Sequence, residues 1–557
     1  MSASSKKKLR REQEAAALTE RQLAEQAEAK KLRNMTIVFV TAIALVILIT
    51  VGVTITRAIT KSGIQEKSTI AVTLDGEELN NAELSYYYID AINNFYSPLH
   101  TDYGAQAPTY AMMLYGIDVT SPLDEQVMNE ETGETWADYF IAQAISNAKS
   151  TAALYNEAVK NGYEMDEATS ASIESVMTNT ATYATLSGYN DTDDYIHVMY
   201  GYGTSFEGYR EYYTRNSIAY AYQTAHSETL TYDDAAIREA ESENFHKYSS
   251  VDYDIYPVYV SAYLGEGTKD EDGVVTYTDE ERAAAVKKAE EVANSLIKDA
   301  ETTADVDAAI KAHVEAENSS AAEETTKYTD RLYSNIAANV AEWLTASARK
   351  DNDMTVIPYT TTSTDDEGNE TESTVGYYVV IFHGINENTF TLPSVRHLLV
   401  AFEGGTTDST TGEKTYSDEE IAKAKEEAEA LLKQWKDGEA TEDSFAALAN
   451  EHSDDGDGTT GGLYEGILPG QMVEEFEEWC FDETRKVGDY GLVKTIYGWH
   501  IMYYADAGEE TYRDYMIAYD LRNAEMNEWY TALVEAVEVK EGNTSKMNKD
   551  LVVDQSH

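Results

Sequence analysis

The sequence predicts an α+β protein of several domains: an apolar helix, a helical domain, and two copies of a module that mixes strands and helices. Three observations lead to this prediction. The chain has 557 residues, which is too long for one ordinary domain and favours three or four. A run of 23 residues near its start carries no charge. A helix-opening segment in the middle of the chain is nearly repeated further along, as expected for an internal duplication.

The uncharged run covers residues 34–56 and is rich in Val, Ile, Leu and Ala. At about 1.5 Å per residue it is long enough for the ~30 Å hydrocarbon layer of a membrane. It has no small-residue exit of the Ala-x-Ala kind, so an uncleaved anchor at 35–57 is favoured over a signal peptide. Residues 1–34 hold nine Lys or Arg and five Glu. Basic residues beside a span stay inside, so we expect a cytoplasmic segment at 1–34, a single-pass anchor in the cell membrane, and extracytoplasmic domains after it.

Composition excludes several classes of function. The chain has 42 Lys and Arg against 101 Asp and Glu, a formal net charge of −59. Phosphate backbones would repel such a polyanion, so no nucleic-acid partner is expected. The single cysteine, Cys480, excludes an intramolecular disulfide and a cysteine-based metal cluster. No metal and no cofactor are predicted.

A mostly helical domain is expected at 66–250. A strand-like run, Ser68 to Leu74, ends at Asp75-Gly76, and a helical pattern begins at Asn81. Many of the chain's 42 tyrosines lie on the helices, either as half-buried packing or as an aromatic cradle for unfolded segments. In the last part of the chain, 508–557, the helix expected at 511–537 has an apolar stripe and should pack back onto this domain. A polar tail should follow from Gly542.

The duplication is visible in three pairs of segments. Each copy opens a helix with a capping hydroxyl followed by acidic residues, and each carries a Glu-Trp pair and an Arg-Lys pair at the same spacing. The paired segments are Thr276 to Glu281 with Thr415 to Glu420, Glu342-Trp343 with Glu478-Trp479, and Arg349-Lys350 with Arg485-Lys486. Copy one is expected at 251–386 and copy two at 391–507.

Copy two contains the densest set of chemical residues. The sequence has no Gly-x-Ser-x-Gly elbow, His-Glu-x-x-His motif, phosphate loop or dinucleotide fingerprint. In copy two, these landmarks follow in order: Val395-Arg396-His397-Leu398-Leu399, Ser453-Asp454-Asp455-Gly456, Gly461-Gly462, Gly470-Gln471-Met472, Phe476 and Tyr497-Gly498-Trp499-His500-Ile501. Together they resemble the parvulin family of peptidyl-prolyl isomerases. With the anchor and the helical domain, the chain resembles PrsA/SurA-like membrane-anchored extracytoplasmic foldases.

The resemblance implies a four-stranded antiparallel sheet surrounded by helices, with two histidines on adjacent central strands. A single strand histidine is usually only a core or surface residue, and it is the joint arrangement that favours a site. The catalytic residues that the resemblance implies are His397, Asp455 and His500. The substrate-binding residues are Met472 and Phe476, which would grip the proline ring, together with Tyr464 and Tyr497.

Copy one is expected to lack this chemistry. Tyr378 stands where copy two has His500, no Gly-Gln-Met segment is present, and His383 falls past the expected end of the last strand. We interpret copy one as a degenerate parvulin-like spacer or peptide-binding module.

The resemblance implies a peptidyl-prolyl isomerase and chaperone that assists the folding of exported proteins at the outer face of the cell membrane. Its partners would be unfolded or newly exported polypeptides that contain X-Pro bonds. The alternative is a non-catalytic holdase in which both copies are peptide-binding scaffolds, and a structural surface protein is a third possibility.

Overall fold

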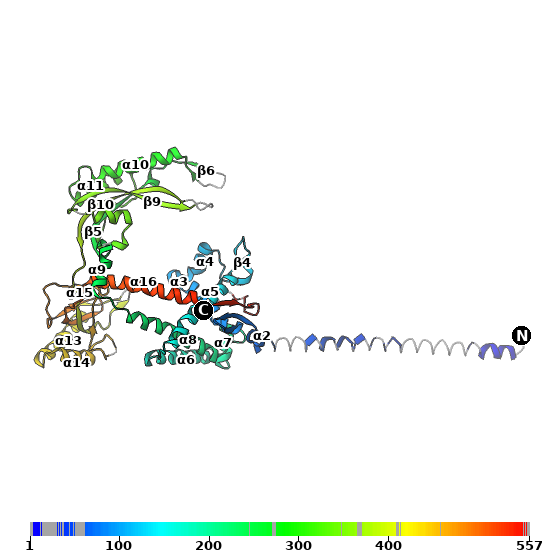
Figure 1. Cartoon of the computed structure of the whole chain (residues 1–557). Helices are drawn as coiled ribbons and strands as arrows, with labels where there is room; N and C mark the ends of the chain where they lie inside the picture. Colours follow the sequence, from blue (N-terminus) through cyan, green and yellow to red (C-terminus); the bar gives the residue numbers. More distant parts are fainter. Residues whose placement is uncertain are drawn as a thin grey trace. The chain divides into compact units, whose positions relative to one another are not determined.

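The computed structural model describes residues 62–553 except 244, 270–274, 347, 365–369, 408–411, 413, 457, 550 and 552, together with some of residues 4–59 (Figure 1). The described chain divides into two compact units. The first consists of residues up to Leu230 and from Glu525 onward, and the second of Thr231–Ala524. Each unit is described by itself below.

The expected anchor at 35–57 lies partly outside the described residues. Among the residues that the structure does describe, no helix has both the length and the apolar character needed to span a membrane.

The first unit is mainly helical, with short strands near its two chain ends. Its elements before the second unit are α2 (Ile64–Ser68), β1 (Ile70–Leu74), β2 (Glu77–Asn80), α3 (Asn81–Tyr103), η1 (Gly104–Gln106), α4 (Ala107–Tyr115), η2 (Leu123–Glu125), β3 (Val127–Asn129), β4 (Glu134–Thr135), α5 (Trp136–Lys160), α6 (Glu167–Leu186), α7 (Thr192–Tyr200) and α8 (Phe206–Thr229). After it come the later part of α16 (Tyr512–Ala536) and β17 (Val539–Glu541).

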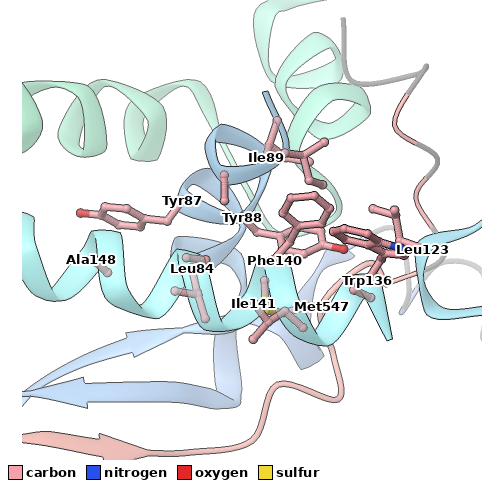
Figure 2. Packing of buried hydrophobic residues seen from close by; sticks show 14 of the residues in the cluster. Leu84, Tyr87, Tyr88, Ile89, Leu123, Trp136, Phe140, Ile141, Ala148 and Met547 are labelled. Carbon is pink, nitrogen blue, oxygen red and sulfur yellow. The ribbon is translucent and has the colours of Figure 1, made fainter. Parts of the chain in front are cut away.

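Helices α3 and α5 form the centre of the first unit's core. Figure 2 shows Tyr88 of α3 beside Phe140 and Trp136 of α5, all three buried. Helix α3 begins at Asn81 because Asn80 forms a capping box: its side chain accepts from the Glu83 amide, and the Glu83 carboxylate accepts from the Asn80 amide.

Described residues after Gly542 belong to this core, so the prediction of a polar tail from Gly542 is wrong. Strand β17 pairs antiparallel with β1, and the Gly542 amide donates to Ala71 O at 2.9 Å. Met547 is buried beside Ile141 in the same core (Figure 2). The open edge of β1 supplies the hydrogen bonds that hold this segment, a long-range pairing that local composition does not reveal.

The second unit includes the residue ranges of both expected copies. Its elements are α9 (Asp234–Glu243), η3 (Phe245–Tyr248), β5 (Ser250–Tyr259), η4 (Val260–Tyr263), β6 (Thr268–Lys269), β7 (Val275–Thr276), α10 (Asp279–Ile297), α11 (Thr303–Glu317), β8 (Thr326–Leu332), η5 (Tyr333–Asn335), α12 (Ala338–Leu344), β9 (Asp353–Thr364), β10 (Glu370–Asn386), β11 (Ser394–Ala401), β12 (Thr406–Thr407), β13 (Lys414–Thr415), α13 (Asp418–Asp437), α14 (Glu442–His452), β14 (Leu463–Tyr464), α15 (Glu474–Cys480), β15 (Tyr490–Lys494), β16 (Gly498–Asp506) and the first part of α16. Helix α9 belongs here, although the sequence pattern placed it in the helical domain, because Ile237 packs against Tyr248 and Ile517.

The second unit has two four-stranded antiparallel sheets with the same strand order. The first is β8-β5-β10-β9 and the second is β14-β11-β16-β15. In each sheet the first and last long strands pair at the centre. Helices α10 and α11 pack on one face of the first sheet, and α13 and α14 take the corresponding place on the second.

Strand β10 is longer than its counterpart β16 and extends past β5 at one end. Its pairing with β5 begins at Gly376, whereas its pairing with β9 begins at Glu370. At the other end β10 continues to Asn386, so His383 lies inside the strand and not past its end. Figure 1 shows β9 and β10 continuing together as a two-stranded hairpin arm.

Candidate functional site

The two histidines lie side by side on one face of the second sheet. In β11 and β16, alternate residues face opposite sides, so His397 and His500 share a face with Val395 and Met502, while Leu398 packs on the other face with α13 and α14. The register pairs His397 with Met502 and Leu399 with His500. The histidines are therefore diagonal neighbours, with ring centroids 5.3 Å apart.

Two glycines allow the backbone to pack tightly around this pair. Gly462 has φ of +65°, and a Cβ there would lie 1.9 Å from His397 O. At this approach the His397 amide donates to Gly462 O at 2.8 Å. Gly498 begins β16, where a Cβ would lie 2.2 Å from Val400 O. A side chain at either position would push the neighbouring strand away.

The loop after α14 places Asp455 beside His397. Strand β14 pairs with only two residues of β11, which leaves the rest of that edge free for the loop. Ser453 Oγ accepts from the Leu399 amide at 3.1 Å, and the Asp454 amide donates to Leu399 O at 2.9 Å. These bonds hold the loop as a strand would be held, and they bring Asp455 Oδ2 to 3.2 Å from His397 Nε2.

The hydrogen bonds around the imidazoles have one consistent direction. The carboxylate of Asp455 can only accept, so His397 donates from Nε2. A neutral His397 then has a bare Nδ1, which accepts from His500 Nδ1 at 3.2 Å. His500 Nε2 is left to accept, and the Thr495 hydroxyl donates to it at 3.0 Å.

Burial keeps both imidazoles neutral, as this direction requires. Burial lowers the pKa of His500 to about 4; a proton on His397 would lower it further, and Asp455 opposes both effects. Burial also lowers the pKa of His397, again against the effect of Asp455. His397 is 3% exposed and His500 is 5% exposed, so water does not reach the link between the rings.

Thr495, which was not predicted as a site residue, closes the network at its inner end. Thr495 is buried, and its Oγ1 accepts from the Tyr497 amide at 3.1 Å while donating to His500. The only sign of its role in the sequence is its position: Thr495 lies five residues before His500, across the turn from β15 to β16. Tyr497 enters the network through its backbone amide, and its side chain, predicted to bind substrate, is 57% exposed.

The remaining predicted residues lie on the same side of the sheet. Tyr464 donates to Asp455 Oδ2 at 2.8 Å, and burial together with this bond raises the pKa of its phenol to about 12. Phe476 on α15 meets the rings of both histidines edge-on, with centroids 5.3 and 5.4 Å away. It is only 2% exposed, so it forms the floor of the site, whereas Met472 is half-buried above the same cluster.

Copy one has no such pair of histidines at the corresponding position. Tyr378 lies between Ile357 and Pro257 in the register of the first sheet, and the centroid of its ring is 4.9 Å from that of Tyr359. The histidine of β10, His383, instead forms short contacts of 2.9 Å with two carboxylates, those of Asp254 and Asp351.

Residues 397–506 match the rotamase family described as the PPIC-type PPIase domain. This range contains all the residues of the network, from His397 on β11 to His500 on β16. The match covers copy two alone.

Three known proteins show partial similarity to this chain. Foldase protein PrsA 3 from Bacillus cereus is 45% identical over 69 residues, which are 12% of this chain and 24% of the relative. The chain thus matches about a quarter of the length of that curated relative. The crystal structure of PrsA from Bacillus subtilis is 23% identical, with coverage of 28% of this chain and 54% of the other and a TM-score of 0.18. The peptidyl-prolyl isomerase ESS1 from Candida albicans is 27% identical, with coverage of 21% and 63% and a TM-score of 0.16.

Proposed function

We propose that this chain, which contains a PPIC-type peptidyl-prolyl isomerase domain at residues 397–506, is a PrsA-like foldase that isomerises X-Pro bonds and holds unfolded polypeptides. The observation that carries the proposal is the single-direction hydrogen-bond network from Thr495 through two buried neutral imidazoles to Asp455. A network of this kind fixes the position of a partly exposed carboxylate at the edge of an apolar floor.

The reaction needs no nucleophile and no metal. Rotation about an X-Pro bond breaks amide conjugation, with an uncatalysed barrier of about 18–20 kcal/mol. A site accelerates the rotation if it fits the twisted amide better than either planar form. Met472 and the edge of the Phe476 floor would contact the proline ring, and Asp455, which has one oxygen held by Tyr464 and His397, would face the rotating carbonyl.

The test is the cis/trans exchange rate of an X-Pro peptide, measured by NMR with the full chain. We expect Asp455→Ala to lower the catalysed rate by about tenfold or more, the scale of one lost electrostatic contact in a transition state. Glu426→Ala is the matched control, because it removes an exposed carboxylate of α13 in the same domain and should leave the rate unchanged. Equal rates for wild type and Asp455→Ala would favour the non-catalytic holdase.

The chaperone part of the proposal is supported by exposed apolar side chains on the first unit. Consecutive exposed residues end helix α4, from Met112 to Tyr115, and the rings of Tyr103 and Tyr110 stack beside this helix at 3.8 Å. Contiguous apolar surface of this kind fits unfolded clients. The full chain should suppress aggregation of an unfolded protein even with Asp455→Ala, and the double variant Met113→Glu, Leu114→Glu should suppress it less. Failure of the wild type to suppress aggregation would refute this part.

We further propose that copy one is a degenerate parvulin-like module and that the chain acts at the outer face of the cell membrane. The shared strand order of the two sheets supports the first statement. The uncharged run 34–56, with its basic flank, supports the second. Protease accessibility in intact cells tests the orientation: the second unit should be cleaved from outside, and residues 1–34 should be protected.

A further inference from the structure

The hairpin arm of copy one leaves a strand edge without a partner at the point where β5 ends. Strand β5 stops at Tyr259, opposite Gly376, while β10 continues back to Glu370 in its pairing with β9. The stretch 370–375 of β10 therefore has β9 on one side and no strand on the other. In the described part of the chain, no hydrogen bond fills this second side.

Two prolines fix which backbone groups face the open side. Pro358 of β9 lies opposite Tyr377, and Pro257 of β5 lies opposite Tyr378. Because proline has no N–H, neither pair can be a hydrogen-bonded one, so Tyr377 directs its N–H and C=O toward β5 and Tyr378 toward β9. Asn339 donates to Pro358 O at 2.8 Å from outside the sheet, in agreement with this phase.

The same phase continues into the arm. The register shifts once, between Thr374 and Gly376, and Thr374 then lies opposite Thr360. Thr360 lies two residues after Pro358 on β9, so its N–H and C=O also point away from β10. Thr360 and Thr374 are therefore a non-hydrogen-bonded pair, and the N–H and C=O of Thr374 point to the open side of β10. Glu372 follows two residues away in the same phase. On β9, Thr362 faces the opposite, outer edge.

The open side of β10 coincides with a groove of about 650 Å³. One wall is the arm, at Thr374 and Val375 of β10 and at Tyr359 and Thr361 of β9. The other wall is η4 with the start of α10, at Val260, Arg282 and Val286. A strand that continued the line of β5 would lie in this groove, with its backbone on β10 and alternate side chains against the apolar wall.

We propose that this groove, the β10 slot, binds an extended segment of an unfolded polypeptide as an added antiparallel strand. The proposal deepens the chaperone part of the proposed function and depends on it. The charges beside the groove are mainly acidic: Glu370 and Glu372 lie on the edge, and the start of α10 carries three acidic residues against Arg282 on the groove wall. The occupant is therefore neutral or basic. A second copy of this chain is disfavoured, because its own arm would bring the same glutamates and a further net charge of −59.

The test uses the full chain and a fluorescent peptide of alternating Val, Thr and Lys residues, without proline so that the isomerase site is not engaged. Anisotropy should show binding to wild type. Thr374→Pro removes the N–H that faces the open side, so it blocks strand addition and leaves the ladder to β9 intact. The affinity should fall about tenfold or more. Thr374→Ala keeps the N–H, and Thr362→Pro places proline on the outer edge of the same arm. Both should bind within about twofold of wild type.

A second probe makes the result independent of how the variants fold. The same peptide with alternate amides N-methylated cannot pair along one edge, and its affinity for wild type should fall to the level seen with Thr374→Pro. The proposal is refuted if the methylated peptide binds as well as the unmethylated one, or if Thr374→Pro binds the peptide like wild type. It is also refuted if the chain forms a dimer that Thr374→Pro dissociates. Isomerase activity and suppression of aggregation are measured in the same samples. If the wild type shows neither activity, the proposed function is refuted, whatever the peptide does.

Discussion

The buried histidine pair should make the isomerase domain lose stability as the pH falls from neutral. His500 titrates at about 4 in the folded domain and near 6.5 when unfolded. Because its folded pKa is depressed, the unfolded chain binds the proton first. The stabilising contribution is therefore complete above pH 6.5 and is lost between 6.5 and about 4. Linkage gives a loss of ~2 kcal/mol at about pH 5 and ~3 kcal/mol at about pH 4.

Urea unfolding of residues 391–507, followed by tryptophan fluorescence at a series of pH values, measures this loss. Both cores that flank the sheet lie within this segment, so we expect it to fold alone. His500→Asn keeps a donor toward His397 but does not titrate. The free energy of unfolding of wild type should fall by ~2 kcal/mol more than that of the variant between about pH 7.5 and 5. Parallel pH profiles for the two proteins would show that the imidazole is not held neutral and would refute the network.

Three further predictions concern single positions. Thr495→Val keeps the shape but leaves His500 Nε2 without its donor, so urea unfolding should show a loss of about 1–3 kcal/mol, and Thr495→Ser should restore most of it. Gly462→Ala should lower the melting temperature far more than Gly466→Ala, because both have positive φ but only the first would place a Cβ against β11; similar losses would contradict the close approach. For His383, hydrogen bonds to its two aspartates raise the pKa against the opposing effect of burial, so its stabilisation is present below pH 6.5 and is lost as the pH rises through the folded pKa. His383→Asn should therefore flatten the alkaline side of the copy-one unfolding profile, and an unchanged profile would count against a charged imidazole there.

The sequence could predict the part of the site that depends on strand alternation and on a family pattern. The resemblance implied that His397 and His500 lie on adjacent central strands, and the register of β11 with β16 places them on one face. The acidic residue of the loop followed from the same resemblance. Thr495 was missed because a single threonine before a turn is an ordinary strand residue, and only the coordinates show that its hydroxyl points to an imidazole.

Long-range pairing accounts for the other differences. The polar composition after Gly542 predicted a free tail, but backbone hydrogen bonds to the edge of β1 hold the start of this segment. The burial of Phe476 depends on how α15 lies across the sheet, and the period of the sequence does not fix that crossing. The arm of β9 and β10 was likewise not predicted, since its threonine-rich strands carry no apolar alternation to mark them.

The pairing of β17 with β1 has a consequence for the order of biosynthesis. The helical unit draws its core from both ends of the described chain, because Met547 and Val553 are buried together with residues of α3 and α5. Synthesis proceeds from the amino end, so this unit cannot be completed until Val553 has emerged, whereas all the strands of the second sheet have emerged by Asp506. The domain at 397–506 is thus free to fold early, and truncation before Met547 would spare it while leaving the helical unit unfinished.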